Sequence, residues 1–132
     1  MARIIMADDD EIVAEIAIEA LNAAGHAVGL LADGTDMMKV IRDRKPDLVI
    51  LDCNMPEKNG IIVLREMRNT TEFYDTPVLI LTGRRGERDV ELAMYEGAND
   101  YMKKPFDPDE LVFRVSELLE KRRIAMALRP TQ

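Results

Sequence analysis

The sequence has one cysteine, one histidine and no tryptophan among its 132 residues. The single cysteine, Cys53, excludes a disulfide within the chain and is typical of proteins from a reducing cytoplasm. Cys53 stands alone, and His26 lies before a different predicted strand, near the opposite edge of the sheet. We therefore expect no site for zinc or for other metals that prefer thiolate and imidazole ligands.

Long apolar runs are also absent. No segment approaches the ~20 consecutive apolar residues that a membrane-spanning helix needs, and the apolar run at residues 3–7 is too short for a secretory signal. Positive charge is scarce, since the formal net charge is −7, and this disfavours binding to nucleic acid or to anionic membranes. We expect a cytoplasmic protein with no direct nucleic-acid or membrane partner.

The composition is that of a folded globular domain. Hydrophobic residues make up 47% of the chain and charged residues 33%, which excludes a disordered protein. The length favours one domain, and neither an internal repeat nor a low-complexity linker divides it. We expect the domain to cover residues 1–123 and the remaining residues, 124–132, to form a short C-terminal tail.

Short apolar segments alternate five times with segments of helical periodicity. The predicted strands cover residues 3–7, 27–31, 48–51, 78–81 and 100–103. The helical patterns that follow them cover residues 12–24, 35–44, 61–67, 87–96 and 108–123. Continuous apolar strands separated by helices indicate a parallel sheet that is covered on both faces. The predicted fold class is α/β, an open doubly wound five-stranded sheet, because the chain is far too short for an eight-stranded barrel.

The sequence makes specific predictions for three of the helices. An aspartate is expected to cap the first helix, whose apolar face is predicted to contain Ile12, Val13, Ile16, Ala17, Ala20, Leu21 and Ala24. The fourth helix has a narrow apolar stripe, so we expect it to be the least firmly packed. The last helix has strong start signals, with Asp107 as its cap and Pro108 in its first turn.

Polar residues stand just past four of the five predicted strands. They are Asp8 and Asp9 after the first strand, Asp52 after the third, Thr82 after the fourth and Lys104 after the fifth. In an open parallel sheet, ligands bind outside the carboxyl ends of the strands. Each of these residues alone has an ordinary structural explanation, since one of the adjacent aspartates could cap a helix and lysines are usually solvated. Together they predict three carboxylates, a hydroxyl and an ammonium at one rim.

This combination of groups suits phosphoryl transfer. Carboxylates that are forced together repel each other unless a cation lies among them, and an all-oxygen ligand set favours Mg²⁺. A hydroxyl and an ammonium can then receive the remaining phosphate oxygens. A carboxylate that is also the nucleophile would form an aspartyl phosphate. We assign this role to Asp52, which stands alone at the end of the predicted central strand. The Lys104–Pro105 peptide bond can be cis or trans.

Four segments resemble the receiver domains of bacterial two-component response regulators, which are CheY-like domains. The segments are MADDD at residues 6–10, DCNMPEKNG at 52–60, LTG at 81–83 and GANDYMKKPF at 97–106. The resemblance covers residues 3–123 and implies a flavodoxin-like (βα)5 fold with strand order 2-1-3-4-5. It also implies that a sensor histidine kinase or a histidine phosphotransfer protein donates a phosphoryl group to Asp52. Such a domain is a signalling switch and not an enzyme, although it catalyses its own phosphorylation and dephosphorylation.

The resemblance assigns roles to individual residues. The Mg²⁺ ligands would be Asp8, Asp9, Asp52 and the backbone carbonyl of Asn54, with Mn²⁺ or Ca²⁺ as substitutes in crystals, and Asp9 is the preferred direct ligand of the acidic pair. The phosphate would be contacted by Thr82 and by Lys104, not by Lys103. The remaining residues it identifies are the switch pair Thr82 and Tyr101, the dephosphorylation-tuning residues Asn54 and Arg84, and the loop-shaping residues Pro56, Gly60 and Pro105.

The signalling face of such domains combines the fourth helix, the fifth strand and the fifth helix. Asp100, Glu110 and Arg114 resemble the dimer-face residues of regulators that carry winged-helix DNA-binding domains. The basic residue that those regulators place late in the fourth helix is not evident here. A homodimer through this face, a downstream protein target and a simple solvated surface are therefore three hypotheses for it.

Two functions other than phosphoryl acceptance are alternatives for this set of residues. A phosphohydrolase of the haloacid dehalogenase type also uses Asp, Thr, Lys and Mg²⁺, but its Asp-x-Asp motif follows its first strand and it usually needs a longer chain. A receiver that is not phosphorylated and only binds proteins typically loses site residues, and none is missing here. Either a single-domain regulator or a receiver module fits the sequence.

Overall fold

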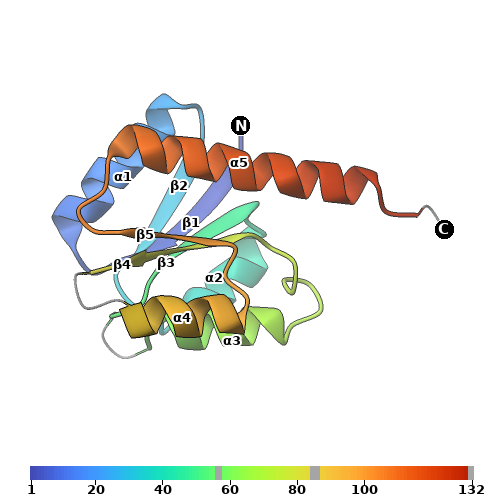
Figure 1. Ribbon diagram of the computed structural model, residues 1–132, viewed down its shortest axis with the longest axis horizontal. Helices are drawn as coiled ribbons and strands as arrows, with labels where there is room; N and C mark the ends of the chain where they lie inside the picture. Colours follow the sequence, from blue (N-terminus) through green and yellow to red (C-terminus); the bar gives the residue numbers. More distant parts are fainter. Residues whose placement is uncertain (56–57, 84–86, 131–132) are drawn as a thin grey trace.

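The computed structural model describes residues 1–55, 58–83 and 87–130. The strands are β1 (Arg3–Ala7), β2 (Ala27–Leu31), β3 (Leu48–Asp52), β4 (Val78–Thr82) and β5 (Asp100–Lys103). The helices are α1 (Glu11–Ala23), α2 (Met37–Arg44), α3 (Gly60–Arg68), α4 (Glu87–Glu96) and α5 (Pro108–Ala127). All neighbouring strands pair in parallel, in the order β2-β1-β3-β4-β5 (Figure 1). The predicted doubly wound fold and the strand order implied by the resemblance are confirmed.

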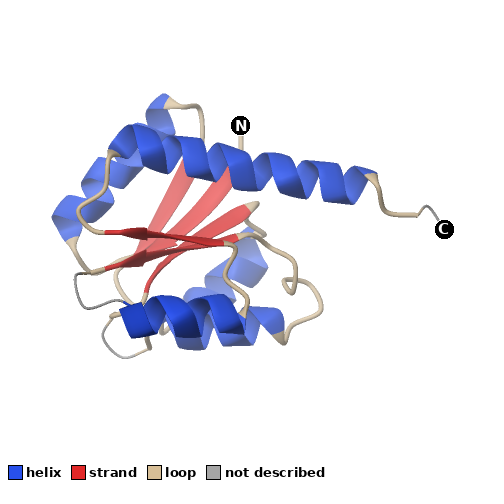
Figure 2. Ribbon diagram, in the orientation of Figure 1, coloured by secondary structure: helices blue, strands red, loops and turns tan. Residues whose placement is uncertain are grey.

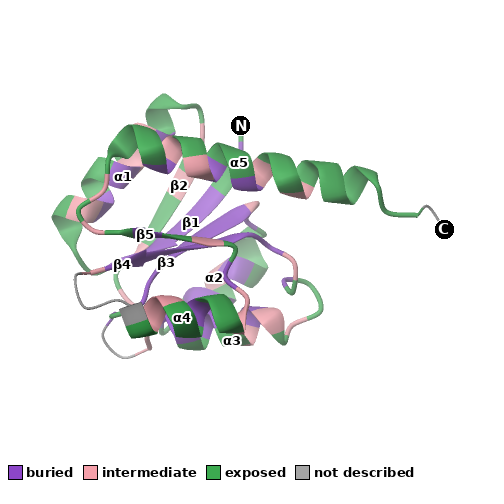
Figure 3. Cartoon of the chain, viewed as in Figure 1, coloured by how far each residue is buried: buried purple, intermediate pink, exposed green. Residues whose placement is uncertain are grey.

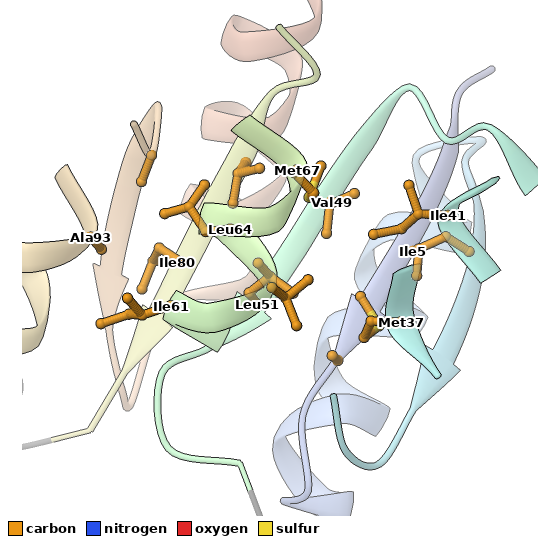
Figure 4. Close-up of a cluster of buried hydrophobic side chains, with 14 of the residues drawn as sticks. Ile5, Met37, Ile41, Val49, Leu51, Ile61, Leu64, Met67, Ile80 and Ala93 are labelled. Atoms are coloured by element: carbon orange, nitrogen blue, oxygen red, sulfur yellow. The ribbon is translucent and has the colours of Figure 1, made fainter. Parts of the chain in front are cut away.

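Helices cover both faces of the sheet, with α1 and α5 on one side and α2, α3 and α4 on the other (Figure 2). Every residue of β3 and β4 is buried, because these strands lie inside the sheet and are covered on both faces. Alternation along the strands divides the core into two layers. Met37, Ile41 and Leu64 pack on the side of α2 and α3, which Figure 4 shows. Leu111 and Val115 of α5 pack on the opposite side with α1.

The inward face of α1 was predicted only in part, because Ala17 and Leu21 are buried as predicted whereas two of the predicted isoleucines are not. Ile12 and Ile16 are exposed, to 72% and 42%, and the buried residues are Ala14, Ala17 and Leu21. Apolar residues surround almost the whole of α1, so hydrophobicity alone did not select one face. Small alanine side chains face the core and let the helix pack close to the sheet and α5.

The side chains that cap α1 and α5 are not among the residues predicted for the functional site. Asp10 caps α1 by accepting the N–H groups of Ile12 and Val13, each at 3.1 Å. Neither Asp8 nor Asp9 therefore serves as the cap, a question that the sequence left open. Asp107 caps α5 as predicted, with Pro108 in the first helical turn.

The helix ends differ from the predictions by more than one residue at two places. Helix α2 begins at Met37 and not at residue 35, and α5 continues to Ala127, so the first residues of the predicted tail are helical. Figure 3 shows that the C-terminal part of α5 is exposed beyond the body of the domain. In α4, Ala93 alone is buried among the residues with a described environment, as its narrow stripe predicted. None of the described helices is both long and apolar enough to cross a membrane.

Gly60 allows the start of α3 to approach the end of β3. A Cβ atom at position 60 would lie 2.3 Å from the carbonyl oxygen of Asp52 and 3.1 Å from Cβ of Leu51. The first of these atoms belongs to the main chain and cannot rotate away. Glycine at this position therefore lets α3 begin directly beside the strand end that carries Asp52.

We predict that Gly60→Ala lowers the free energy of unfolding by about 1–3 kcal/mol, the usual cost of overpacking. Chemical denaturation of the wild type and the variant measures the change. Gly83→Ala is the matched control, because a Cβ at position 83 would meet no atom of the described residues within 4 Å. Equal stabilities for the wild type and Gly60→Ala would contradict the close approach.

Candidate functional site

The predicted site residues meet at the carboxyl edge of the sheet. Asp8 directly follows β1, Asp52 ends β3, Thr82 ends β4 and Lys104 directly follows β5. The strand order reverses beside β1, because β2 lies on one side of it and β3 on the other. This is the position at which open α/β sheets bind their ligands.

Three carboxylates form the centre of the site. One oxygen atom from each of Asp8, Asp9 and Asp52 lies within 4.8 Å of the others. Asp8 and Asp52 are buried, whereas Asp9 is exposed at the mouth. One oxygen of each buried carboxylate accepts a hydrogen bond from a backbone N–H group. Asp8 Oδ1 accepts the N–H of Asp10 at 2.9 Å, and Asp52 Oδ1 accepts the N–H of Asn54 at 3.1 Å.

Lys104 joins the two buried carboxylates through their other oxygens. Its Nζ lies 2.9 Å from Asp8 Oδ2 and 3.2 Å from Asp52 Oδ2. The backbone N–H of Lys104 donates to Thr82 O at 2.7 Å, which fixes the end of β5 against β4. The Lys104–Pro105 peptide bond is cis. Lys104 is thus the lysine that reaches the carboxylates, while Lys103 is exposed, and the expected contact of Lys104 with a phosphate stays a prediction.

The pKa values of the buried groups reflect this crowding. Burial raises the pKa of Asp8 and the charge of Asp52 adds to the effect, although Lys104 and the Asp10 N–H oppose it. Burial also works against the charge on Lys104, but the hydrogen bonds and charges of Asp8 and Asp52 outweigh it and raise the Lys104 pKa. One ammonium therefore faces three carboxylates, and the cluster lacks positive charge.

The donor set fits a magnesium ion. Asp8 Oδ2 is completely buried, and although Lys104 Nζ lies beside it as an ion-pair partner, it accepts no hydrogen bond of regular geometry within the described parts of the chain. Carboxylate oxygens are the ligands that Mg²⁺ prefers. Asp8, Asp9 and Asp52 would hold the ion. Asn54 is exposed beside them, and the expected use of its backbone carbonyl as a ligand stays a prediction.

Thr82 and Tyr101 lie on the same face of the sheet. Thr82 pairs with Lys103, and Tyr101 pairs with Ile80, so the alternation of side chains places both on the face covered by α3 and α4. Thr82 is fully buried, and among the described residues its hydroxyl makes only a long contact of 3.5 Å to Gly83 O. Tyr101 is exposed. Arg84 and Pro56, which the resemblance also singled out, lie outside the described residues.

Cys53 follows Asp52 but is not a competing nucleophile. Burial, assisted by the negative charges of Asp89 and Asp52, raises the pKa of its thiol to about 12. The thiolate is the reactive form of cysteine, so this thiol is inert near neutral pH. Cys53 therefore does not compete with the carboxylates of the site as a nucleophile.

Gly34 is a residue of this rim that the sequence analysis did not single out. A Cβ atom at position 34 would lie 2.1 Å from the carbonyl oxygen of Lys58. Glycine at this position therefore lets the segment after β2 approach the segment after Asp52. The Asp33-Gly34 pair is a turn signal, but a contact with Lys58 depends on the folded arrangement of two distant loops.

A scan against family models matches residues 4–116 to the response regulator receiver domain. The chain belongs to this family, whose members are signalling modules and not conventional enzymes. It is 39% identical over 119 residues to the DNA-binding response regulator MtrA of Mycolicibacterium paratuberculosis, covering 90% of this chain and 52% of that protein. The response regulator MprA of Mycobacterium sp. (strain KMS) is 37% identical, with 90% and 51% covered. The chain thus spans about half the length of these curated relatives.

Solved structures agree with the fold. A putative response regulator from Chloroflexus aurantiacus superposes with a TM-score of 0.86 at 33% identity, covering 90% of this chain and 98% of that one. The receiver domain of the Francisella response regulator 1452 superposes with a TM-score of 0.83 at 28% identity, with 92% and 99% covered. The acidic cluster and Lys104 therefore lie in a receiver fold.

We predict that Asp8→Asn stabilises the metal-free protein by a few degrees in its unfolding midpoint. The raised pKa means that ionised Asp8 costs folding free energy, and a neutral amide removes that cost. The gain should shrink as the pH falls through the folded-state pKa of Asp8, because the wild-type carboxyl is then protonated. Thermal unfolding over a pH series, in a chelating buffer, measures it.

Asp9→Asn is the matched control for this prediction. Asp9 is exposed, so its substitution should leave the metal-free midpoint almost unchanged. Both variants should lose most of the stabilisation that added Mg²⁺ gives the wild type, because each removes a ligand oxygen. A metal-free midpoint for Asp8→Asn below that of the wild type would show that ionised Asp8 favours folding.

Proposed function

We propose that this receiver accepts a phosphoryl group on Asp52 from the phosphohistidine of a sensor histidine kinase or a histidine phosphotransfer protein, in the cytoplasm. The observation that carries the proposal is the buried cluster in which Lys104 contacts both Asp8 and Asp52 at the strand ends. Oxygen atoms of Asp52 and of the acidic pair lie within 4.8 Å of one another there, and the ammonium contacts two of the three carboxylates. None of the carboxylate, hydroxyl and ammonium groups expected at the strand ends is missing, which argues against a receiver that only binds proteins.

The transfer requires little covalent chemistry from the protein. A carboxylate oxygen of Asp52 attacks the phosphorus as the phosphorus–nitrogen bond breaks, and the bonding electron pair returns to the imidazole nitrogen of the donor. Mg²⁺, when bound, neutralises charge on the transferring group. Lys104 stands beside Asp52 Oδ2, where its ammonium can pair with a phosphoryl oxygen. The hydroxyl of Thr82 can donate to another phosphoryl oxygen.

Thr82 and Tyr101 would transmit the phosphorylation state of Asp52 to the protein surface. Because both side chains lie on the α4 side of the sheet, movement of Thr82 toward the phosphoryl group would leave room for the ring of Tyr101 to turn inward. Tyr101 is exposed in the present structure, which is the starting position that such a switch requires. The surface formed by α4, β5 and α5 would then change shape and bind a downstream protein.

A homodimer through the α4-β5-α5 surface is a second use of this switch. Arg114 already pairs within the chain, with Asp100 at 3.0 Å and with Glu110 at 2.8 Å, and its Nη1 donates to Tyr101 O at 2.9 Å. Dimerisation would have to exchange these pairs for pairs between two chains.

The name of MtrA describes DNA binding by a protein about twice as long, and the acidic receiver itself has the wrong charge for DNA. Both a single-domain regulator and a receiver module of a longer protein fit this proposal.

We expect the wild type to gain one phosphoryl group on incubation with Mg²⁺ and a small phosphodonor, as detected by intact mass. Asp52→Asn should gain none. Asp36→Asn is the matched control, since Asp36 is exposed near the same edge and its side chain makes no capping hydrogen bond. It should be phosphorylated like the wild type. A wild type that forms no adduct would overturn the proposed function.

Asn54 and Arg84 should set the lifetime of the phosphoryl group. We expect Asn54→Ala and Arg84→Ala to change the rate of dephosphorylation, because in this family the side chains two past the acceptor and two past the threonine tune that rate. The decay of the phosphorylated form after removal of the donor measures the rate. Unchanged decay in both variants would rule out this tuning role.

A further inference from the structure

The C-terminal part of α5 lies over the amino ends of the strands, opposite the phosphoryl-acceptor site. Leu118 is the last buried residue of this helix, which continues past the body of the domain to Ala127 (Figure 1). A cavity of about 360 Å³ lies between this part of α5 and the residues that precede β4 and β5. No residue of the phosphoryl-acceptor site lines it.

The lining of this cavity is rich in positive charge. Lys121, Arg122 and Arg129 come from α5 and its C-terminal end, while Asp75 is the one carboxylate among the lining residues. Arg129 forms an ion pair with Asp75. Arg122 lies 3.9 Å from the same carboxylate and donates to the backbone oxygen of Asp47 at 3.1 Å. Its Nε atom is buried and has no hydrogen-bond partner within the described parts of the chain.

A fourth cation adjoins the cavity from α3. Arg68 donates to the side-chain oxygen of Asn99, which lines the cavity, at 3.0 Å. Burial lowers the pKa of Arg68, and the positive charge of Arg122 lowers it further, while Asp75 opposes both. Four cationic side chains therefore lie in or beside a cavity whose described lining contains one carboxylate, Asp75, in a chain whose overall formal charge is −7. This concentration of unbalanced positive charge is the opposite of what the composition alone suggests.

We propose that this cavity binds a compact phosphate-bearing anion. A dianion would supply the negative charge that Asp75 alone does not, and guanidinium groups match the geometry of phosphate oxygens. The volume suits a small ligand. Because residues after Leu118 contribute no buried apolar side chain, a bound anion would also fasten the end of α5 to the segment before β4. The site is separate from Asp52 and needs neither Mg²⁺ nor phosphorylation.

The experiment titrates isotope-labelled protein with inorganic phosphate in a chelating buffer at constant ionic strength and follows backbone and side-chain N–H resonances. We expect saturable shifts at residues 120–129 and in the side-chain amide of Asn99. Lys121→Ala and Arg129→Ala should each weaken binding about tenfold, because each removes a charge-assisted contact. Both residues are exposed on the surface, so the variants should fold.

Arg123→Ala is the matched control. It removes one positive charge from the same helix, but Arg123 is paired with Glu120 and does not line this cavity. It should change the affinity less than twofold. The proposal is overturned if the shifts do not saturate, if chloride alone produces them, or if Arg123→Ala weakens binding as much as Arg129→Ala. Failure of phosphorylation at Asp52 would leave these outcomes unaffected.

Discussion

The structure of the site depends on one interaction, the contact of the Lys104 ammonium with the buried carboxylates of Asp8 and Asp52. Each of the three residues comes from the end of a different strand, so the contact exists only when β1, β3 and β5 stand in one parallel sheet. Burial makes uncompensated carboxylates costly, and one ammonium does not balance the three that meet here. The remaining negative charge suits the site to a divalent cation.

The rest of the fold holds these strand ends in register. Both faces of β3 are buried under helices, which fixes the strand that carries Asp52. Gly60 lets α3 begin against the main chain of Asp52, and Asp10 takes over the capping of α1 so that Asp8 and Asp9 remain available. Asp52 is therefore held between buried main-chain segments, whereas Asp9 is exposed at the mouth of the site.

The sequence predicted the features that depend on local pattern. Apolar runs located all five strands, and the polar residues just past them identified Asp8, Asp52 and Lys104, while the strand order came from the family resemblance. Features that depend on distant contacts were missed. The inward face of α1 was predicted only in part because apolar residues occupy most of that helix, and the contact of Gly34 with Lys58 joins two separate loops. The pairing of Arg129 with Asp75 likewise requires α5 to extend beyond the predicted boundary of the domain.

We propose that Asp52, and no other carboxylate of the cluster, forms the acyl phosphate. Borohydride reduction of the phosphorylated chain converts an aspartyl phosphate to homoserine, and peptide sequencing by mass spectrometry then locates the converted residue. We expect homoserine at position 52 and unmodified aspartate at positions 8 and 9. Homoserine at position 8 or 9, with position 52 unmodified, would contradict it.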